Sequence, residues 1–283
     1  MEKLDRLGWA EGIGVRAFGV HAGVRVSTAG VLPQVLPLLP PGCMKSRRAT
    51  VQRLYSLVIA EGSQRAGVRR MHILYADSSR IARDTELGHV LAALETDLHR
   101  YIAEASPEMT FLHAGVVGWQ GRAILLPGRS LSGKTTLVRE LLRLGATYYS
   151  DEFAVVDDSG KVHPFTRPLG IREDSTYAQT KYTAETLGAT SGIKPLPLGV
   201  VVICKYKAGA RWKPALLSNG QGALELMANS IAVRNHPHQT LQRIQKLTAG
   251  TVFVKGTRGE ANESAEPILN LNLLHRSNRG EKA

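Results

Sequence analysis

Hydrophobic and polar residues follow two periods along the chain, which together predict a mixture of strands and helices. Apolar runs or alternation typical of strands occur at 15–26, 53–60, 71–75, 109–117, 122–126 and 197–206. Apolar residues spaced by three and four, as on one face of a helix, occur at 84–104, 135–144, 221–233 and 240–248. Asp84 is the expected N-cap of the first of these helices. The pattern predicts an α/β protein.

The chain is expected to form two regions, divided just after the first long helix. Ser106-Pro107 closes that helix. We expect residues 1–105 to form a smaller N-terminal α+β module, whose basic charge would help to hold an acidic or leader-bearing substrate, and residues 106–275 to form a separate α/β core. Residues 276–283 are expected to be a frayed tail. Hydrophobic residues make up 43% and charged residues 21%, which favours packed cores over disorder.

Charge points to an anionic partner. The chain has 36 Lys and Arg against 24 Asp and Glu, a net charge of +12. The excess is uneven, because seven basic residues lie between Lys45 and Arg70 against the single acidic residue Glu61. Nucleic acid, phosphate ligands and acidic peptides all meet this description.

The compartment can be inferred from the cysteines and the apolar runs. Two cysteines, Cys43 and Cys204, exclude a disulfide framework or a multi-cysteine metal site and suit a reducing cytoplasm. The apolar runs fall short of the roughly 20 residues that a membrane-spanning helix needs. The first residues mix charges with glycines, unlike a signal peptide. We therefore expect a cytoplasmic protein with no membrane partner.

A phosphate-binding loop is the most specific motif. Residues 128–135 read GRSLSGKT and fit G-x-x-x-x-G-K-[ST] at every fixed position. A strand precedes the loop and a helix follows it, the context that an anion site needs. In such loops Lys134 reaches the β- and γ-phosphates and Thr135 binds Mg²⁺. The expected nucleotide-binding residues are Gly128, Arg129, Ser130, Leu131, Ser132, Gly133, Lys134, Thr135 and Thr136.

An acidic pair follows the loop closely. Asp151 and Glu152 come after a short strand at 146–150, and Asp151 is 17 residues beyond Lys134. The end of that strand is expected at the same sheet edge as the loop, which would bring the pair beside the γ-phosphate. A helix cap or a solvated turn is the structural alternative. Residues 157–160 read DDSG and predict a hairpin turn without chemistry.

His113 can be placed by counting across a predicted hairpin. Strands at 109–117 and 122–126 are joined by a turn, and centring that turn between Trp119 and Gln120 sets His113 opposite Leu126. His113 would then reach the phosphates and Asp151. A purely structural histidine is the alternative.

These motifs together resemble a known family. The run HAGVV from His113, the loop at 128–135 and the run SDE at 150–152 resemble the HPr serine kinase/phosphorylase family. The likeness is closer to the divergent bacterial HPr-kinase-related proteins, some of which belong to ribosomal-peptide tailoring pathways. It is strong from Phe111 to Arg172 and weaker over 53–57 and 255–260.

The resemblance implies a P-loop kinase core related in fold to phosphoenolpyruvate carboxykinase, using ATP and Mg²⁺ to phosphorylate serine, or threonine, on a peptide or small protein. Asp151 would be the base, assisted by His113, with Lys134 on the phosphates. Glu152 stands where the family has a second aspartate and would hold Mg²⁺ directly or through water, together with Thr135. Because no counterpart of the phosphorylase segment follows Arg172, HPr itself is not the expected substrate.

Other functions remain open. Arg129 and Leu131 replace small residues of the family; Arg129 either adds charge near the phosphates or points to solvent, and Leu131 stiffens the loop. A nucleotide-binding regulator with little or no kinase activity is therefore the alternative. A nucleic-acid-associated ATPase comes last, because no nucleic-acid module is recognisable and no nucleic-acid partner is expected. Relatives that assemble make a homo-oligomer worth testing.

Overall fold

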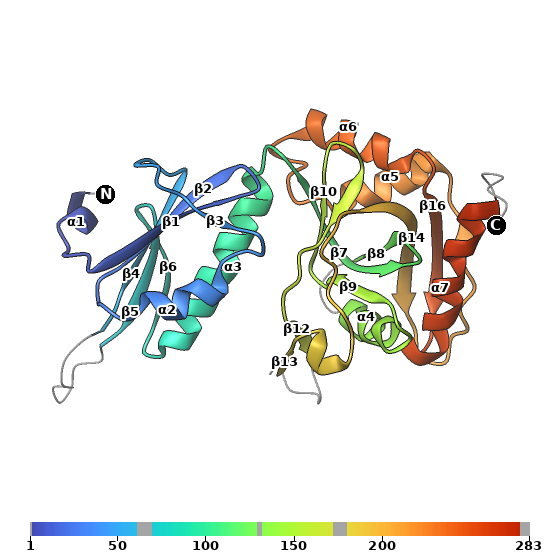
Figure 1. Ribbon diagram of the computed structural model, residues 1–283, viewed down its shortest axis with the longest axis horizontal. Coiled ribbons are helices and arrows are strands. Elements are labelled where there is room, and N and C mark those ends of the chain that lie inside the picture. The colour runs from blue at the N-terminus through green and yellow to red at the C-terminus, as the bar shows by residue number, and fades with distance from the viewer. Residues whose placement is uncertain (1, 61–69, 129–131, 172–179, 278–283) are drawn as a thin grey trace. The chain divides into compact units, whose positions relative to one another are not determined.

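The computed structural model describes residues 2–60, 70–128, 132–171 and 180–277 (Figure 1). The chain divides into two compact units, Met1–Pro107 and Glu108–Ala283, hereafter the N-terminal and C-terminal units. Each unit combines helices with a sheet of its own, so the α/β class is confirmed at this level. No helix in the described part of the chain is both long and apolar enough to cross a membrane.

The N-terminal unit is a sheet covered by one long helix. Its elements are α1 (Glu2–Asp5), β1 (Glu11–Ala17), β2 (Val20–Val26), α2 (Leu32–Val35), the 3-10 helix η1 (Leu36–Leu38), β3 (Met44–Lys45), β4 (Arg53–Val58), β5 (His72–Ala76), β6 (Ser79–Asp84) and α3 (Leu87–Ala105). The strand order is β3-β1-β2-β4-β5-β6. Val90, Leu94 and Leu98 lie on the buried side of α3, with the three-and-four spacing of the sequence.

Asp84 is not the N-cap of α3 that the sequence had predicted. It ends β6, a strand that the sequence pattern missed, and the N-cap position of α3 is taken by Glu86. The Asp84 carboxylate still accepts a hydrogen bond from the backbone N–H of Glu86, at 2.9 Å. The pattern failed because the side chains of β6 are mostly exposed and two of them are arginines, so the strand shows no apolar alternation.

The C-terminal unit is built on a larger sheet. Its elements are β7 (Thr110–Trp119), β8 (Arg122–Pro127), α4 (Lys134–Arg143), β9 (Thr147–Ser150), β10 (Phe153–Val156), β11 (Lys161–His163), β12 (Leu169–Ile171), β13 (Thr180–Tyr182), the 3-10 helix η2 (Glu185–Leu187), β14 (Leu196–Tyr206), β15 (Ala215–Leu216), α5 (Asn219–Ala228), α6 (Pro237–Thr248), β16 (Val252–Arg258) and α7 (Ala261–Ser277). The expected tail thus begins inside α7, and residues 278–283 lie outside the described part.

The strand order of this sheet is β11-β10-β7-β8-β14-β16-β15, with β9 paired to β7. Because β11 also pairs with β14, five strands close on themselves. Among the described residues of this unit, one hydrophobic cluster includes apolar residues of α4 and α7, and another includes those of α5 and α6. Strands β8, β14 and β16 are parallel neighbours, so their carboxyl ends meet at one edge.

Candidate functional site

The loop at 128–135 opens at the carboxyl edge of the parallel strands. Strand β8 ends at Pro127, and α4 begins at Lys134 (Figure 1). Gly133, the N-cap of α4, has a φ of +77°, a conformation that side chains other than glycine's rarely adopt. The first backbone N–H groups of α4 have no partner within the helix, which is what an anion site at a helix N-terminus uses. Arg129, Ser130 and Leu131 lie outside the described residues.

The hairpin of β7 and β8 corrects the expected register by two residues. Ala114 pairs with Pro127 and Gly115 with Leu126, so Leu126 does not face His113. Instead the backbone N–H of Gly128 donates to the His113 carbonyl at 3.2 Å. The reason is the turn, which is centred on Gln120 and Gly121, both with positive φ. The correction brings His113 opposite the first residue of the loop.

Asp151 reaches the start of α4 by a route that the sequence did not predict. Strand β9 pairs antiparallel with β7 and not with β8. Because β8 also pairs antiparallel with β7, β8 and β9 run in the same direction. Their carboxyl ends therefore lie at the same edge, as expected. The Thr135 hydroxyl donates to Oδ2 of Asp151 at 3.4 Å, a long hydrogen bond that joins the loop to the acidic pair.

The Asp151 carboxylate is largely withdrawn from water. Burial raises its pKa, although the Tyr148 hydroxyl, Arg167 and Thr135 act in the opposite direction. The Tyr148 oxygen lies 3.1 Å from Oδ1 of Asp151 and 2.7 Å from the Arg167 carbonyl, and its single proton serves one of them at a time. A carboxylate with a raised pKa accepts a proton more readily near neutral pH.

Glu152 has another partner. Its Oε2 pairs with the Arg167 guanidinium, and its side chain is 41% exposed. The contact to Thr135 is thus made by Asp151, and the magnesium role of Glu152 stays a prediction. Arg167 is a site residue to which the sequence assigned no role, although it belongs to the run at 164–172 that resembles the kinase family.

The pKa values of Lys134 and His113 are both lowered, which favours the uncharged form of each side chain. Burial lowers the pKa of Lys134, against the opposing charge of Asp151. Its Nζ donates to the Gly128 carbonyl at 2.5 Å, within the loop itself. Burial, and then the Lys134 charge, lower the pKa of His113, while a hydrogen bond to the Glu152 backbone opposes them. A neutral His113 ring at physiological pH can accept a proton.

The loop contains a buried polar group that has no hydrogen-bond partner in the part of the chain that the structure describes. This group is the Ser132 hydroxyl oxygen, which is shielded from solvent. A Cβ on Gly128 would lie 2.9 Å from it, so only glycine leaves the space open. Unpaired buried hydroxyls are costly, and a phosphate oxygen would relieve this one. Thr136, the last expected loop residue, is exposed.

Arg258 is a second residue that the sequence analysis missed. It ends β16, is 2% exposed, and donates from Nη2 to the Gly133 carbonyl at 2.9 Å and from Nη1 to the Gly259 carbonyl at 2.9 Å. The signal was available: the segment TVFVKGTR at 251–258 begins with an apolar stretch and ends in arginine, and parallel strands end at the same edge. A fixed guanidinium thus supports the glycine that opens α4.

The described residues fit a nucleotide with magnesium. Ser132 offers a hydroxyl with no partner among the described residues, and Lys134 is a cation. Thr135 with Asp151 supplies a hydroxyl and a carboxylate oxygen, the ligands that Mg²⁺ prefers beside phosphates. No group of three or more His, Cys, Asp or Glu side chains converges anywhere in the described residues. No model of a known protein family and no curated protein matches the chain. The support for a function is thus the chemistry of the site.

Proposed function

We propose that the chain is an ATP-dependent kinase of the HPr serine kinase-like type, which phosphorylates a serine or threonine of a peptide or small protein. The observation that carries the proposal is the contact between the Thr135 hydroxyl, at the start of α4, and the largely buried Asp151 carboxylate. Phosphoryl transfer requires an anion site and a nearby acceptor for the proton of the attacking hydroxyl. The contact brings both requirements to one sheet edge.

The phosphates would be held by the first turn of α4, by Lys134 and by the Ser132 hydroxyl. Arg258 fixes the Gly133 carbonyl and so keeps the turn in place. Thr135 is the proposed Mg²⁺ ligand, with Glu152 joining directly or through water. Bound Mg²⁺ would neutralise charge on the transferred group.

Asp151 would act as the base. The acceptor oxygen forms a bond to the γ-phosphorus, the bond from that phosphorus to the bridging oxygen breaks, ADP leaves, and the hydroxyl proton passes to Asp151. His113, neutral at physiological pH, would assist by holding or accepting that proton. Burial, and then the Lys134 charge, lower the His113 pKa and so favour the neutral ring.

The experiment follows label from γ-labelled ATP in the presence of Mg²⁺, with and without a lysate of the source organism. Wild type, Asp151→Asn and Lys134→Ala are compared, and ATP binding is measured separately by calorimetry. Glu263→Gln and Lys255→Ala remove charges from exposed positions of the same unit and serve as matched controls.

We expect the wild type and both controls to label a discrete peptide or protein. Asp151→Asn should bind ATP normally and lose transfer by a factor of about 100 or more. Lys134→Ala should lose binding. If ATP binds, and binding is lost in Lys134→Ala, but no label is transferred, the kinase proposal is wrong and a nucleotide-binding regulator replaces it. Undiminished transfer by Asp151→Asn would remove Asp151 as the base.

A further inference from the structure

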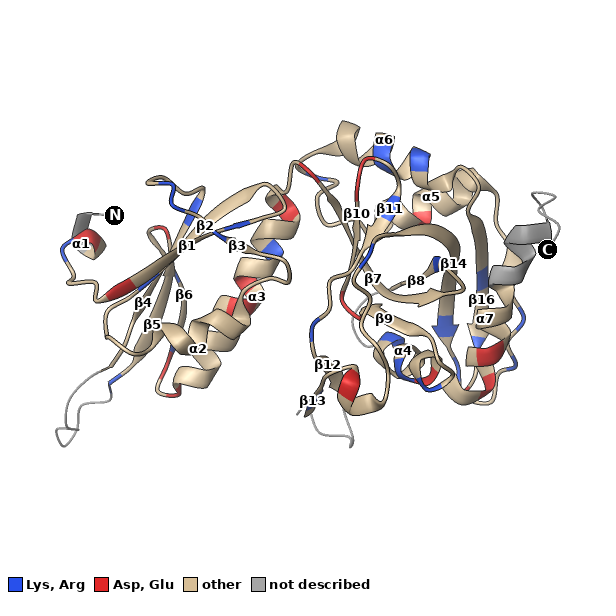
Figure 2. Cartoon of the chain, in the orientation of Figure 1, with Lys and Arg blue, Asp and Glu red and all other residues tan. Residues whose placement is uncertain are grey.

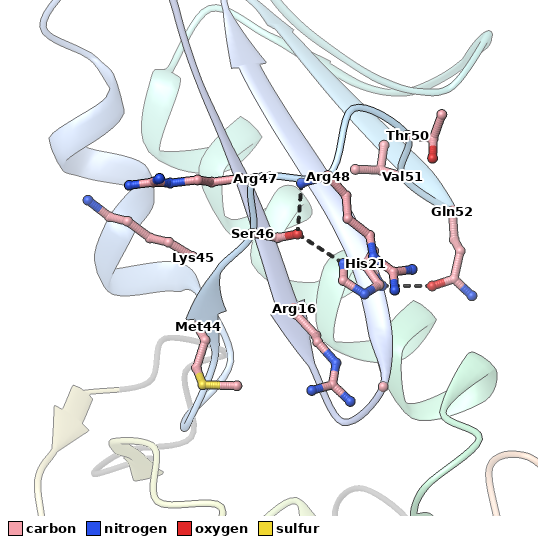
Figure 3. Close-up of a pocket in the computed structure, with 11 residues that line it drawn as sticks. Arg16, His21, Met44, Lys45, Ser46, Arg47, Arg48, Thr50, Val51 and Gln52 are labelled. Carbon is pink, nitrogen blue, oxygen red and sulfur yellow. Dashed lines mark hydrogen bonds between the residues drawn. The ribbon is translucent and has the colours of Figure 1, made fainter.

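The N-terminal unit has a basic hollow at one edge of its sheet. The hollow has a volume of about 680 Å³ and lies over the β1–β2 hairpin and the chain that follows β3 (Figure 3). The basic residues that line it are Arg16, Lys45, Arg47 and Arg48, beside His21. No described lining residue is acidic. Figure 2 shows the segment after β3 in blue, the colour of Lys and Arg.

Three of the cations that line the hollow, Lys45, Arg47 and Arg48, have no carboxylate partner among the described residues. All three side chains are exposed. Arg53, in contrast, belongs to the same basic stretch of sequence but pairs with Asp97. Three basic residues of that stretch therefore line the hollow, together with Arg16 of β1.

The segment that carries these charges is held in place at both ends. The Ser46 N–H donates to the Gly14 carbonyl at 2.8 Å, and the Ser46 hydroxyl lies 3.0 Å from Nδ1 of His21. At the other end, the Gln52 N–H donates to the His21 carbonyl at 2.8 Å, and the His21 N–H donates to Oε1 of Gln52 at 2.7 Å. Because this backbone is fixed, a ligand need not order it on binding.

The cations are spread along the segment. In Figure 3, Lys45 and Arg47 point to one side, Arg48 lies beside His21, and Arg16 reaches away from both groups. A compact anion would contact one or two of these side chains. A chain with several negative charges could contact all of them.

We propose that this hollow binds an extended, acidic segment of the peptide or protein that the kinase phosphorylates. Strand β3 is the last strand of the sheet order, so an extended peptide can lie along its outer side. The exposed Met44 side chain, 59% accessible, offers apolar contact next to the charges. Nucleic acid is disfavoured, because the described lining residues include no Phe, Tyr or Trp on which bases could stack.

The inference rests on the proposed function only in calling the bound peptide a substrate. Binding itself needs no ATP and no residue of the C-terminal unit, so it is measured without nucleotide. Failure of peptide binding and failure of label transfer are therefore separate results.

The test uses the full chain and a fluorescent peptide of alternating Asp and Glu with a terminal serine, followed by anisotropy. A peptide with Asn and Gln in place of the acids is the ligand control. Arg47→Gln/Arg48→Gln removes two charges from the hollow. Arg80→Gln/Arg83→Gln is the matched control. It also removes two positive charges, but from exposed positions of β6, the strand at the other end of the sheet order.

We expect the acidic peptide to bind and the neutral peptide not to bind. Arg47→Gln/Arg48→Gln should weaken binding about tenfold, while Arg80→Gln/Arg83→Gln should change it little. Equal weakening by both variants would mean attraction to net charge alone and would overturn the proposal. So would absence of binding, tighter binding of a single-stranded oligonucleotide of equal charge through the same arginines, or displacement of the peptide by micromolar inorganic phosphate.

Discussion

At the scale of single residues, the candidate site concentrates groups that are costly to bury. Burial of the Asp151 carboxylate penalises its ionised form, and the Ser132 hydroxyl is shielded without a partner among the described residues. Costs of this kind are common at sites where function requires them and stability does not. They predict that some substitutions in the site stabilise the fold while removing its activity.

Asp151→Asn should be such a substitution. The amide is neutral, so it avoids the penalty of a buried charge. Its oxygen can accept from one of the Thr135 and Tyr148 hydroxyls, and its NH2 group can donate to the oxygen of the other. We expect the melting temperature without nucleotide to rise by a few degrees at neutral pH while transfer is lost. Differential scanning calorimetry measures this, with Glu263→Gln as the control that should not move. A lower melting temperature would show that the carboxylate contributes net stability.

Replacing Arg258 should lower stability as well as activity, because Arg258 supports both the site and the fold. Arg258→Lys keeps the charge but cannot hold the Gly133 and Gly259 carbonyls with one planar group. We expect a lower melting temperature and ATP binding weakened about tenfold. Lys255→Arg, an exposed exchange on the same strand, should change neither. Wild-type ATP affinity in Arg258→Lys would mean that Arg258 does not support the loop.

At the scale of elements, the β10–β11 hairpin turn is as the sequence predicted and makes a prediction about pH. Burial of the Asp157 carboxyl raises its pKa, but hydrogen bonds from His163, Ser159 and the backbone N–H of Lys161 outweigh burial and lower the pKa to about 2. The stabilisation is complete above the usual pKa of 3.8 and is lost as the pH falls towards 2.

Asp157→Asn should therefore cost about 1 kcal/mol of unfolding free energy at neutral pH, after allowance for solvent screening. The difference from wild type should shrink on acidification below about pH 4. Urea unfolding at neutral pH and at about pH 3 measures it, with Glu263→Gln as the control. A difference that is constant across this range would show that the hydrogen bonds do not depend on the carboxylate charge.

The sequence predicted most of the elements that carry the site, because strong local signals mark them. Strand β8, helix α4, the strand before Asp151 and the apolar strand β14 all have a clear period or flanking glycines. The edge at which Asp151 arrives also followed from sequence, since the direction of a strand after a helix is strongly constrained.

What failed depended on partners distant in sequence or on turn chemistry. The register of His113 depends on two positive φ angles at Gln120 and Gly121, and the glutamine gives no sign of its own. The sequence assigned no partner to β9, because its pairing with β7 is set by tertiary contacts. Arg258 meets Gly133 across 125 residues, and only the assembled sheet brings them together.

At the scale of the whole molecule, each unit has a complete sheet. The described strands β1–β6 pair only with one another, and so do β7–β11, β14, β15 and β16. The long helix α3 closes the N-terminal unit, while two hydrophobic clusters lie in the C-terminal unit. A unit with its own core can fold alone. The two proposed activities, nucleotide binding and peptide binding, should therefore be separable.

We predict that residues 108–283, expressed alone, fold and bind ATP with the affinity of the full chain, and that residues 1–107 fold and bind the acidic peptide. Circular dichroism reports folding, and calorimetry and anisotropy report the two affinities. A fragment of residues 1–84 is the control: it lacks α3, whose Leu94 and Leu98 are fully buried, and should not fold. If 108–283 folds but binds no ATP, the nucleotide site needs the N-terminal unit. Peptide binding by 108–283 would instead place the acidic segment outside the hollow, because Arg16, Arg47 and Arg48 are absent from that fragment.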